Sequence, residues 1–314
     1  MEMAFEEKEA RYRDTLRVAY TQMQQAVPSS FGRLLGAYQE AFSRDWWRTS
    51  KCFERLKVVN LGGSAIGTGI TVPRFFIFEV AEALRQETGR PFTRGDHLQD
   101  TTANLDAFVE VHGNLKAHAV NLEKIAGDLR ALASDAFGTP GFRIPARQVG
   151  SSIMPGKVNP VIPEYVISAA HAVYANDALV GSMAAMGFLD LNAYLPIIGQ
   201  RMLSSLDLLI SADRTLARHL VSGVEIDGAL TEEQLMRSPV IATALLPFVG
   251  YDKSAEAARL MKSQGVSIFE ANRALNLVDE ETLRSALTPA NLLKLGYRIS
   301  DVAGESGKDH AEKP

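Results

Sequence analysis

The chain has 314 residues, of which 46% are hydrophobic and 22% are charged, with 33 Lys and Arg against 37 Asp and Glu. This composition is typical of a globular protein, and the balanced charge without a basic run argues against a nucleic-acid partner. No apolar run approaches the roughly 20 residues of a membrane-spanning helix, no signal-peptide pattern opens the chain, and the single cysteine excludes an internal disulfide, so a cytoplasmic protein with no membrane partner is expected.

The first half of the chain is predicted to be helical with two interruptions. Apolar residues at three- and four-residue spacing predict helices over 1–17, 29–56, 73–89 and 95–134. The segment 20–28 lacks that spacing and is expected to be a loop. The glycine-rich segment 61–70 is too irregular for a dinucleotide-binding fingerprint, which also requires a preceding strand, so it is expected to be a tight turn.

Two histidines, His112 and His118, fall within the last of these predicted helices. Because they are six residues apart, they lie on different faces of the helix and do not form a metal-binding pair. We expect His118 to be a surface or core histidine and His112 to be a packing or hydrogen-bonding residue, and we predict no metal site.

The most unusual stretch runs from Gln148 to Glu164. Gly150 and Gly156 free the backbone there, while three prolines restrict it and remove amide donors. The polar side chains between them are Ser151, Ser152, Lys157 and Asn159. Pro160 then opens a helical pattern. A polar loop that leads into a helix can hold a carboxylate against a lysine and open amides, although composition alone is equally compatible with a linker.

The second half of the chain is also predicted to be helical. Helices are expected over 161–181 and about 193–220, and a change of composition after residue 222 marks a domain boundary. Beyond it, Thr231 to Gln234 reads as a capping box and Thr288-Pro289 as a helix start. We therefore predict an all-α protein with a long-helix bundle over 1–222, a small C-terminal helical domain over 223–303 and a disordered tail over 304–314.

Long helices that are apolar on more than one side cannot bury that surface in a monomer of this size. Such helices commonly form bundles that are shared between subunits. A homo-oligomer is therefore expected.

Gly150 to Pro160 resembles the signature of the aspartase/fumarase superfamily of lyases, residue for residue over eleven positions. A second region of that superfamily, written Gly-Arg-Thr-His/Gln-x-Gln-Asp-Ala-x-Pro, resembles the segment 19–28. Its Thr, Gln, Gln, Ala and Pro match here, whereas Ala19-Tyr20 replaces the Gly-Arg pair and Gln25 replaces the Asp. The turn at 61–70 and the segment Val111–Lys116 also resemble the family, the latter more its aspartases than its fumarases.

The resemblance implies a lyase that removes ammonia from L-aspartate to give fumarate without an organic cofactor. It implies that Ser151 is the catalytic base and that Lys157 and Asn159 bind a carboxylate of the substrate. Thr21 and Gln22 would approach the same substrate from a neighbouring subunit of a homotetramer. The supporting residues are Glu164, Ser152 and Gly150.

The resemblance also leaves alternatives open. Family members carry an N-terminal region before the equivalent of Met1, so we expect this chain to be the C-terminal part of a split enzyme, completed by a separate N-terminal polypeptide. A fumarase or a lyase for another succinyl compound is the next interpretation. An inactive helical scaffold or regulatory partner is the alternative of a different class.

Overall fold

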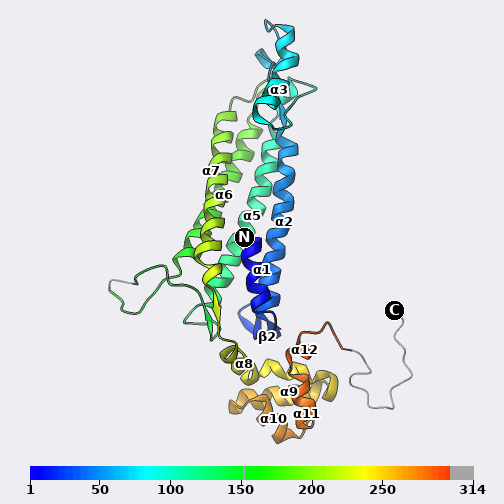
Figure 1. Cartoon of the computed structure of the whole chain (residues 1–314), viewed down its shortest axis with the longest axis vertical. Helices are drawn as coiled ribbons and strands as arrows, with labels where there is room; N and C mark the ends of the chain where they lie inside the picture. Colours follow the sequence, from blue (N-terminus) through cyan, green and yellow to red (C-terminus); the bar gives the residue numbers. More distant parts are fainter. Residues whose placement is uncertain (151–152, 298–314) are drawn as a thin grey trace, which may run out of the picture. The chain divides into compact units, whose positions relative to one another are not determined.

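The computed structural model describes residues 1–150 and 153–297, and it is helical with a few short strands, which confirms the predicted fold class (Figure 1). The helices are α1 (Glu2–Arg11), α2 (Phe31–Leu56), α3 (Arg74–Thr88), α4 (Asp100–Ala103), α5 (Asp106–Leu132), α6 (Val161–Ala185), α7 (Leu195–His219), α8 (Gly228–Arg237), α9 (Leu246–Gln264), α10 (Ile268–Leu275), α11 (Glu280–Ala286) and α12 (Pro289–Leu292). Short 3₁₀ turns are η1 (Ala65–Gly67), η2 (Val221–Gly223) and η3 (Pro239–Leu245).

The strands form three two-stranded ladders. The antiparallel hairpin pairs β1 (Leu16–Thr21) with β2 (Gln24–Ser30), the parallel ladder pairs β3 (Val58–Val59) with β4 (Thr93–Arg94), and the second antiparallel ladder pairs β5 (Phe142–Arg143) with β6 (Glu225–Ile226). Among the described residues, no helix is both long and apolar enough to cross a lipid bilayer.

The chain packs as two compact units. Unit 1 consists of Met1–Glu2, Tyr38–Ala131 and Pro145–Gly223, and unit 2 consists of Met3–Ala37, Leu132–Ile144 and the chain from Val224 onward. The chain therefore enters unit 2 three times. The division into domains 1–222 and 223–303 remains a proposal, and the tail 304–314 lies outside the described residues.

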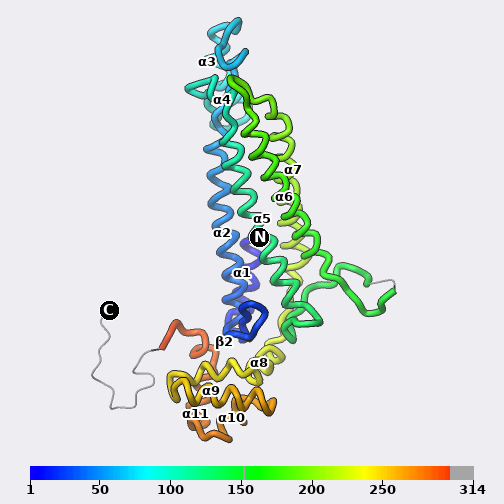
Figure 2. The backbone as a smooth tube through the Cα atoms, turned by 180° about the vertical axis from the view of Figure 1, so that it is seen from behind, coloured from blue at the N-terminus to red at the C-terminus, as the bar shows by residue number. Residues whose placement is uncertain are grey.

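Unit 1 is built from the long helices α2, α5, α6 and α7, which run side by side in both views (Figures 1 and 2). Each helix buries one stripe of side chains. On α5 the buried stripe is Val111, His112, Leu115, Ala119, Leu122, Ile125, Ala126 and Leu129. A fully buried Leu or Ile contributes about 1.5–3 kcal/mol, so such a stripe is enough to hold the bundle together.

Unit 2 packs its short helices around one apolar cluster. The hairpin contributes Leu16 and Val18, and η3 and α8–α11 contribute Leu235, Ile241, Ala242, Leu245, Ala257, Met261, Ile268, Ala271 and Leu283. The helix predicted over 1–17 and the loop predicted over 20–28 are therefore both wrong in part. The helix α1 ends at Arg11, and a β-hairpin follows it. The alternation of Leu16, Val18 and Tyr20 has the period of a strand, and both Leu16 and Val18 are buried.

The predicted helix over 95–134 is also interrupted. Thr93–Arg94 pairs with Val58–Val59, α4 is a single turn, and Asn104 adopts an extended conformation between α4 and α5. The Asn104 side chain donates to Asp100 Oδ1, a local bond that competes with the helix. The long helix therefore starts only at Asp106.

One of the two predicted helix starts in unit 2 is wrong. Asp227 caps α8 by accepting from the amides of Ala229 and Leu230, so the capping box predicted at Thr231 is wrong. A capping box instead opens α10 with Ser267 and Glu270. The start predicted at Thr288-Pro289 is confirmed in α12.

Candidate functional site

The predicted site residues are divided between the two units. Lys157, Asn159 and Glu164 belong to unit 1, and Thr21 and Gln22 belong to unit 2. The predicted base and its neighbour, Ser151 and Ser152, lie outside the described residues.

The loop that carries Lys157 and Asn159 belongs to unit 1, which the chain re-enters at Pro145, and it extends away from α6 and α7 in both views (Figures 1 and 2). Lys157 is exposed, whereas Asn159 is half-buried. The backbone amide of Asn159 donates to Gln148 Oε1 at 3.2 Å. The loop is therefore closed at its base by one side chain.

Gly150 lies close to the other side of the loop. Its φ is +106°, in the region that favours glycine, and a β-carbon at this position would lie 3.3 Å from the Lys157 carbonyl oxygen. A supporting role for Gly150 in the site remains a prediction.

Glu164 lies in the first turn of α6, directly after the loop. Its amide donates to the Pro160 carbonyl at 3.2 Å, and its carboxylate is exposed. A carboxylate in the first turn of a helix is stabilised by the helix dipole. Pro160 occupies the N-cap position of this helix.

Thr21 and Gln22 lie at the turn of the β1–β2 hairpin, in which Thr21 pairs with Gln24. Gln22 and Met23 have φ of 47° and 60°. Left-handed conformation at both central positions is the geometry of the tight hairpin turn that normally selects Asn-Gly. Non-glycine residues are uncommon there, and such strain concentrates at functional sites. The hairpin thus presents Gln22, which is exposed, on a strained turn.

Unit 1 contains a buried ion cluster that was not predicted from the sequence. His118 Nδ1 donates to Asp45 Oδ2 at 2.9 Å, and His118 Nε2 donates to Asp213 Oδ2 at 3.1 Å. Asn121 donates to both oxygens of Asp45, and Arg48 pairs with Asp45 at 2.6 Å. The cluster therefore joins α2, α5 and α7.

The charged forms of His118 and Asp45 stabilise each other. Burial opposes the charged form of His118, but hydrogen bonds to Asp213 and Asp45 outweigh it and raise the pKa from 6.5 to about 9. Burial likewise opposes the charged form of Asp45, yet the bonds from His118 and Asn121 hold its pKa below the usual range. No sequence signal pointed to this arrangement, because the three helices are far apart along the chain.

His112 lies in a second buried network. It donates from Nδ1 to Asp177 Oδ1 at 3.1 Å, and its Nε2 lies 2.9 Å from Ser205 Oγ. Asn176 donates to the same hydroxyl at 3.0 Å. Because the hydroxyl accepts from Asn176, its proton is available to Nε2, and every group is satisfied. Ser205 and His112 are fully buried, so this Asp-His-Ser arrangement is structural.

Within residues 1–150 and 153–297, no group of three or more His, Cys, Asp and Glu side chains is placed to hold a metal ion.

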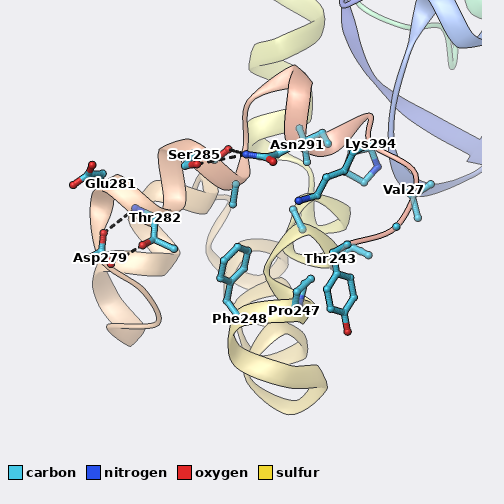
Figure 3. Close-up of a pocket in the computed structure, with 16 residues that line it drawn as sticks. Val27, Thr243, Pro247, Phe248, Asp279, Glu281, Thr282, Ser285, Asn291 and Lys294 are labelled. Carbon is cyan, nitrogen blue, oxygen red and sulfur yellow. Dashed lines mark hydrogen bonds between the residues drawn. The ribbon is translucent and has the colours of Figure 1, made fainter. Parts of the chain in front are cut away.

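A cavity of about 1,180 Å³ lies in unit 2 (Figure 3). Its wall includes Phe248 and Thr243, and the side chain of Lys294 extends toward it. Asp279 and Thr282, also on the wall, are hydrogen-bonded to each other at the start of α11. None of the described site residues predicted from the sequence lines this cavity.

Two protein-family models match parts of this chain. The sequence model of a family described as "Lyase" matches residues 1–175, more than half of the chain, and one described as "Fumarase C C-terminus" matches residues 241–294. The chain therefore belongs to the lyase family of the aspartases and fumarases.

Individual relatives agree with this assignment. The aspartate ammonia-lyase of Pseudomonas fluorescens is 38% identical over 92% of this chain and 61% of its own length, and that of Bacillus subtilis is 33% identical over 100% and 64%. A solved fumarate lyase:delta crystallin from Brucella melitensis, bound to cobalt, is similar with a TM-score of 0.86 and 36% identity over 93% of this chain and 63% of that chain. A class II fumarase from Schistosoma mansoni is similar with a TM-score of 0.84 and 26% identity, over 92% and 64%.

The chain thus spans less than two thirds of the length of these relatives.

Proposed function

We propose that this chain carries catalytic residues of a lyase that eliminates ammonia from L-aspartate to give fumarate. The observation that carries the proposal is the loop Gly150–Pro160, which matches the superfamily signature and holds Lys157 and Asn159 on one stem. Relatives named aspartate ammonia-lyase, 33% and 38% identical, support the choice of substrate.

The difficult step of this reaction is removal of a proton from the β-carbon. The neighbouring carboxylate makes that proton only weakly acidic, and its removal yields a doubly negative aci-carboxylate. The site must therefore supply cations and donors where the charge develops, with a base in reach of the proton. The electron pair of the broken C–H bond then forms the carbon–carbon double bond, and the amino group leaves with the pair of the C–N bond. Such an elimination requires no organic cofactor.

Each proposed residue has a role in that step. Ser151 is the base, acting as an alkoxide that nearby cations and amides stabilise. Lys157 supplies positive charge to a substrate carboxylate, and Asn159 supplies an amide donor. Thr21 and Gln22 bind the same substrate from another subunit.

The proposed assembly is a homotetramer with a shared helical bundle. Large apolar side chains remain exposed on the long helices of unit 1: Trp46 is 65% exposed, Val120 50%, Leu203 65% and Ile210 46%. Exposed apolar surface of this kind is expected to pack against other subunits.

A fumarase-like hydration reaction is the second candidate. It is favoured by the match of residues 241–294 to the fumarase C-terminal family and by the likeness to the Schistosoma mansoni enzyme. Gln22 favours aspartase, because a carboxylate such as Glu164 can form a proton relay with a histidine at that position and not with an amide. An inactive scaffold is disfavoured by the polar loop, since a scaffold has no use for an exposed lysine on a glycine- and proline-rich segment.

The proposal extends to the rest of the enzyme. The relatives are longer than this chain, and we propose that activity requires the lyase segment that this chain does not cover. Measuring the rate of fumarate formation with and without that segment tests this part directly. Full activity of the chain alone would contradict it.

Fumarate formation from L-aspartate and from L-malate, followed by ultraviolet absorbance, tests the reaction. Aspartate is expected to give fumarate at a rate that the Ser151→Ala variant lowers by at least about 100-fold. Ser152→Ala is the matched control and is expected to retain most of the rate. Equal rates for an active wild-type preparation, which contains the uncovered lyase segment, and for its Ser151→Ala variant would remove Ser151 from the mechanism.

A further inference from the structure

The loop that carries Lys157 and Asn159 is held at its base by two side chains that no catalytic role explains. Arg147 and Gln148 occupy consecutive positions on the stem that enters the loop, and both are exposed. Both are hydrogen-bonded to backbone groups of described residues within unit 1. An exposed side chain gains little from burial, so these hydrogen bonds are what fixes the two side chains on the stem.

The bond of Arg147 fastens the stem to a rigid helix. Arg147 Nε donates to the carbonyl of His219 at 2.9 Å, and His219 is the last residue of α7. The final carbonyls of a helix have no partner within it, and a cation there also interacts favourably with the helix dipole. The start of the loop is thereby tied to the bundle.

The bond of Gln148 ties the two stems to each other. Its Oε1 accepts the backbone amide of Asn159 at 3.2 Å. Two residues further into the loop, Gly150 approaches the carbonyl oxygen of Lys157 so closely that an added β-carbon would lie 3.3 Å from it. The pairs 148 with 159 and 150 with 157 fit one antiparallel register, so the stems run alongside each other over this distance.

We propose that Gln148 is a positioning residue of the lyase site, which sets the backbone of Asn159 and thereby the placement of Lys157 for a substrate carboxylate. The inference rests on the proposed function, because it assigns Lys157 and Asn159 to substrate binding. Gln148 itself acts through the amide of Asn159 and does not contact the substrate. The role requires an acceptor of glutamine length at this position.

Two substitutions separate the acceptor from the size of the side chain. Gln148→Met keeps the length and removes the acceptor, whereas Gln148→Glu keeps an oxygen acceptor. Gln86→Met is the matched control, because Gln86 is an exposed glutamine on α3 whose hydrogen bond goes to the Glu82 side chain. Gln148 and Gln86 are both exposed on the surface, so the three variants are expected to fold.

The first measurement is amide hydrogen exchange at Asn159 in the full chain. Exchange is expected to be roughly 2- to 10-fold faster in Gln148→Met, the range that one neutral hydrogen bond supports, and unchanged in Gln148→Glu and Gln86→Met. Wild-type exchange in Gln148→Met would overturn the proposal. This readout requires no activity.

The second measurement is the steady-state rate of fumarate formation from L-aspartate. A fall in kcat/KM of roughly 2- to 10-fold is expected for Gln148→Met, mainly through a higher KM, because the carboxylate is bound in both the ground and transition states. Unchanged KM and kcat in an active preparation would overturn the positioning role. A wild-type preparation that contains the uncovered lyase segment and still forms no fumarate would count against the proposed function, and the exchange at Asn159 would still decide whether Gln148 anchors the loop.

Discussion

Replacing His118 with leucine tests the buried ion cluster of unit 1. His118 is 13% exposed and donates to two carboxylates, of which Asp45 is 4% exposed and Asp213 33%. Removing one partner of a buried ion pair costs about 3–5 kcal/mol, because a charge remains without compensation. Asp45 keeps Asn121 and Arg48, so we expect a loss of unfolding free energy near the lower limit, about 3 kcal/mol.

The pH dependence of stability gives an independent estimate. The pKa of His118 rises from 6.5 to about 9 in the folded protein. A raised pKa means that the stabilisation is fully present below pH 6.5 and is lost as the pH rises through 9. At 1.36 kcal/mol for each pKa unit, the amount lost is roughly 3 kcal/mol. The two estimates agree.

Urea denaturation at a fixed protein concentration, measured from pH 6 to pH 10, checks the loss of unfolding free energy in His118→Leu and the loss of wild-type stability with rising pH. The wild-type chain is expected to lose stability toward pH 10, and His118→Leu is expected to lack that part of the slope. The control is His171→Leu, because His171 is 63% exposed and its pair with Glu123 is a surface ion pair, worth at most about 1 kcal/mol. A His118→Leu chain within about 0.5 kcal/mol of wild type at pH 6 would refute the assignment of a charged, buried histidine.

The hairpin, the loop and the second buried network each support one further prediction. Met23→Gly removes the left-handed strain of the hairpin turn and is expected to raise the unfolding free energy by up to about 1 kcal/mol, whereas Gln24→Gly, in the strand, is expected to lower it; thermal and urea unfolding distinguish the two. Lys157→Met is expected to lower kcat/KM for fumarate formation by about 100-fold, and a loss of less than threefold would exclude Lys157 from charge stabilisation. Ser205→Ala leaves two buried partners unsatisfied and is expected to cost about 1–3 kcal/mol in urea unfolding, while the exposed Ser211→Ala is expected to cost under 0.5 kcal/mol; equal losses would contradict the network.

Much of the helical architecture could be predicted from periodicity. The predicted helices over 29–56 and 73–89 correspond closely to α2 and α3, and those over 161–181 and 193–220 correspond to α6 and α7. In α2, α6 and α7 the apolar residues repeat at helical spacing because one side of each helix is buried, whereas α3 buries only Ala81. The loop signature at 150–160 is equally local, which is why it could be recognised without a structure.

The predictions that were wrong lie where local preference and packing disagree. The hairpin at Leu16–Ser30 was assigned partly to a helix and partly to a loop, because a few alternating residues give a weak strand signal beside helical neighbours. Burial of Leu16 and Val18 in unit 2 resolves that choice. The start of α5 was placed too early, since Asn104 breaks the helix through a bond to Asp100 that no periodicity reveals.

The amino-acid sequence by itself determined the helical class, the family and the loop that carries Lys157 and Asn159. Each of these features depends on residues that are neighbours along the chain. Only the tertiary structure decided what the two histidines of α5 do. His118 receives its aspartates from α2 and α7, and His112 receives its partners from α6 and α7. A side chain's charge and hydrogen bonds depend on what packs against it, and these partners lie 65 to 95 residues away in sequence from the histidine that they contact.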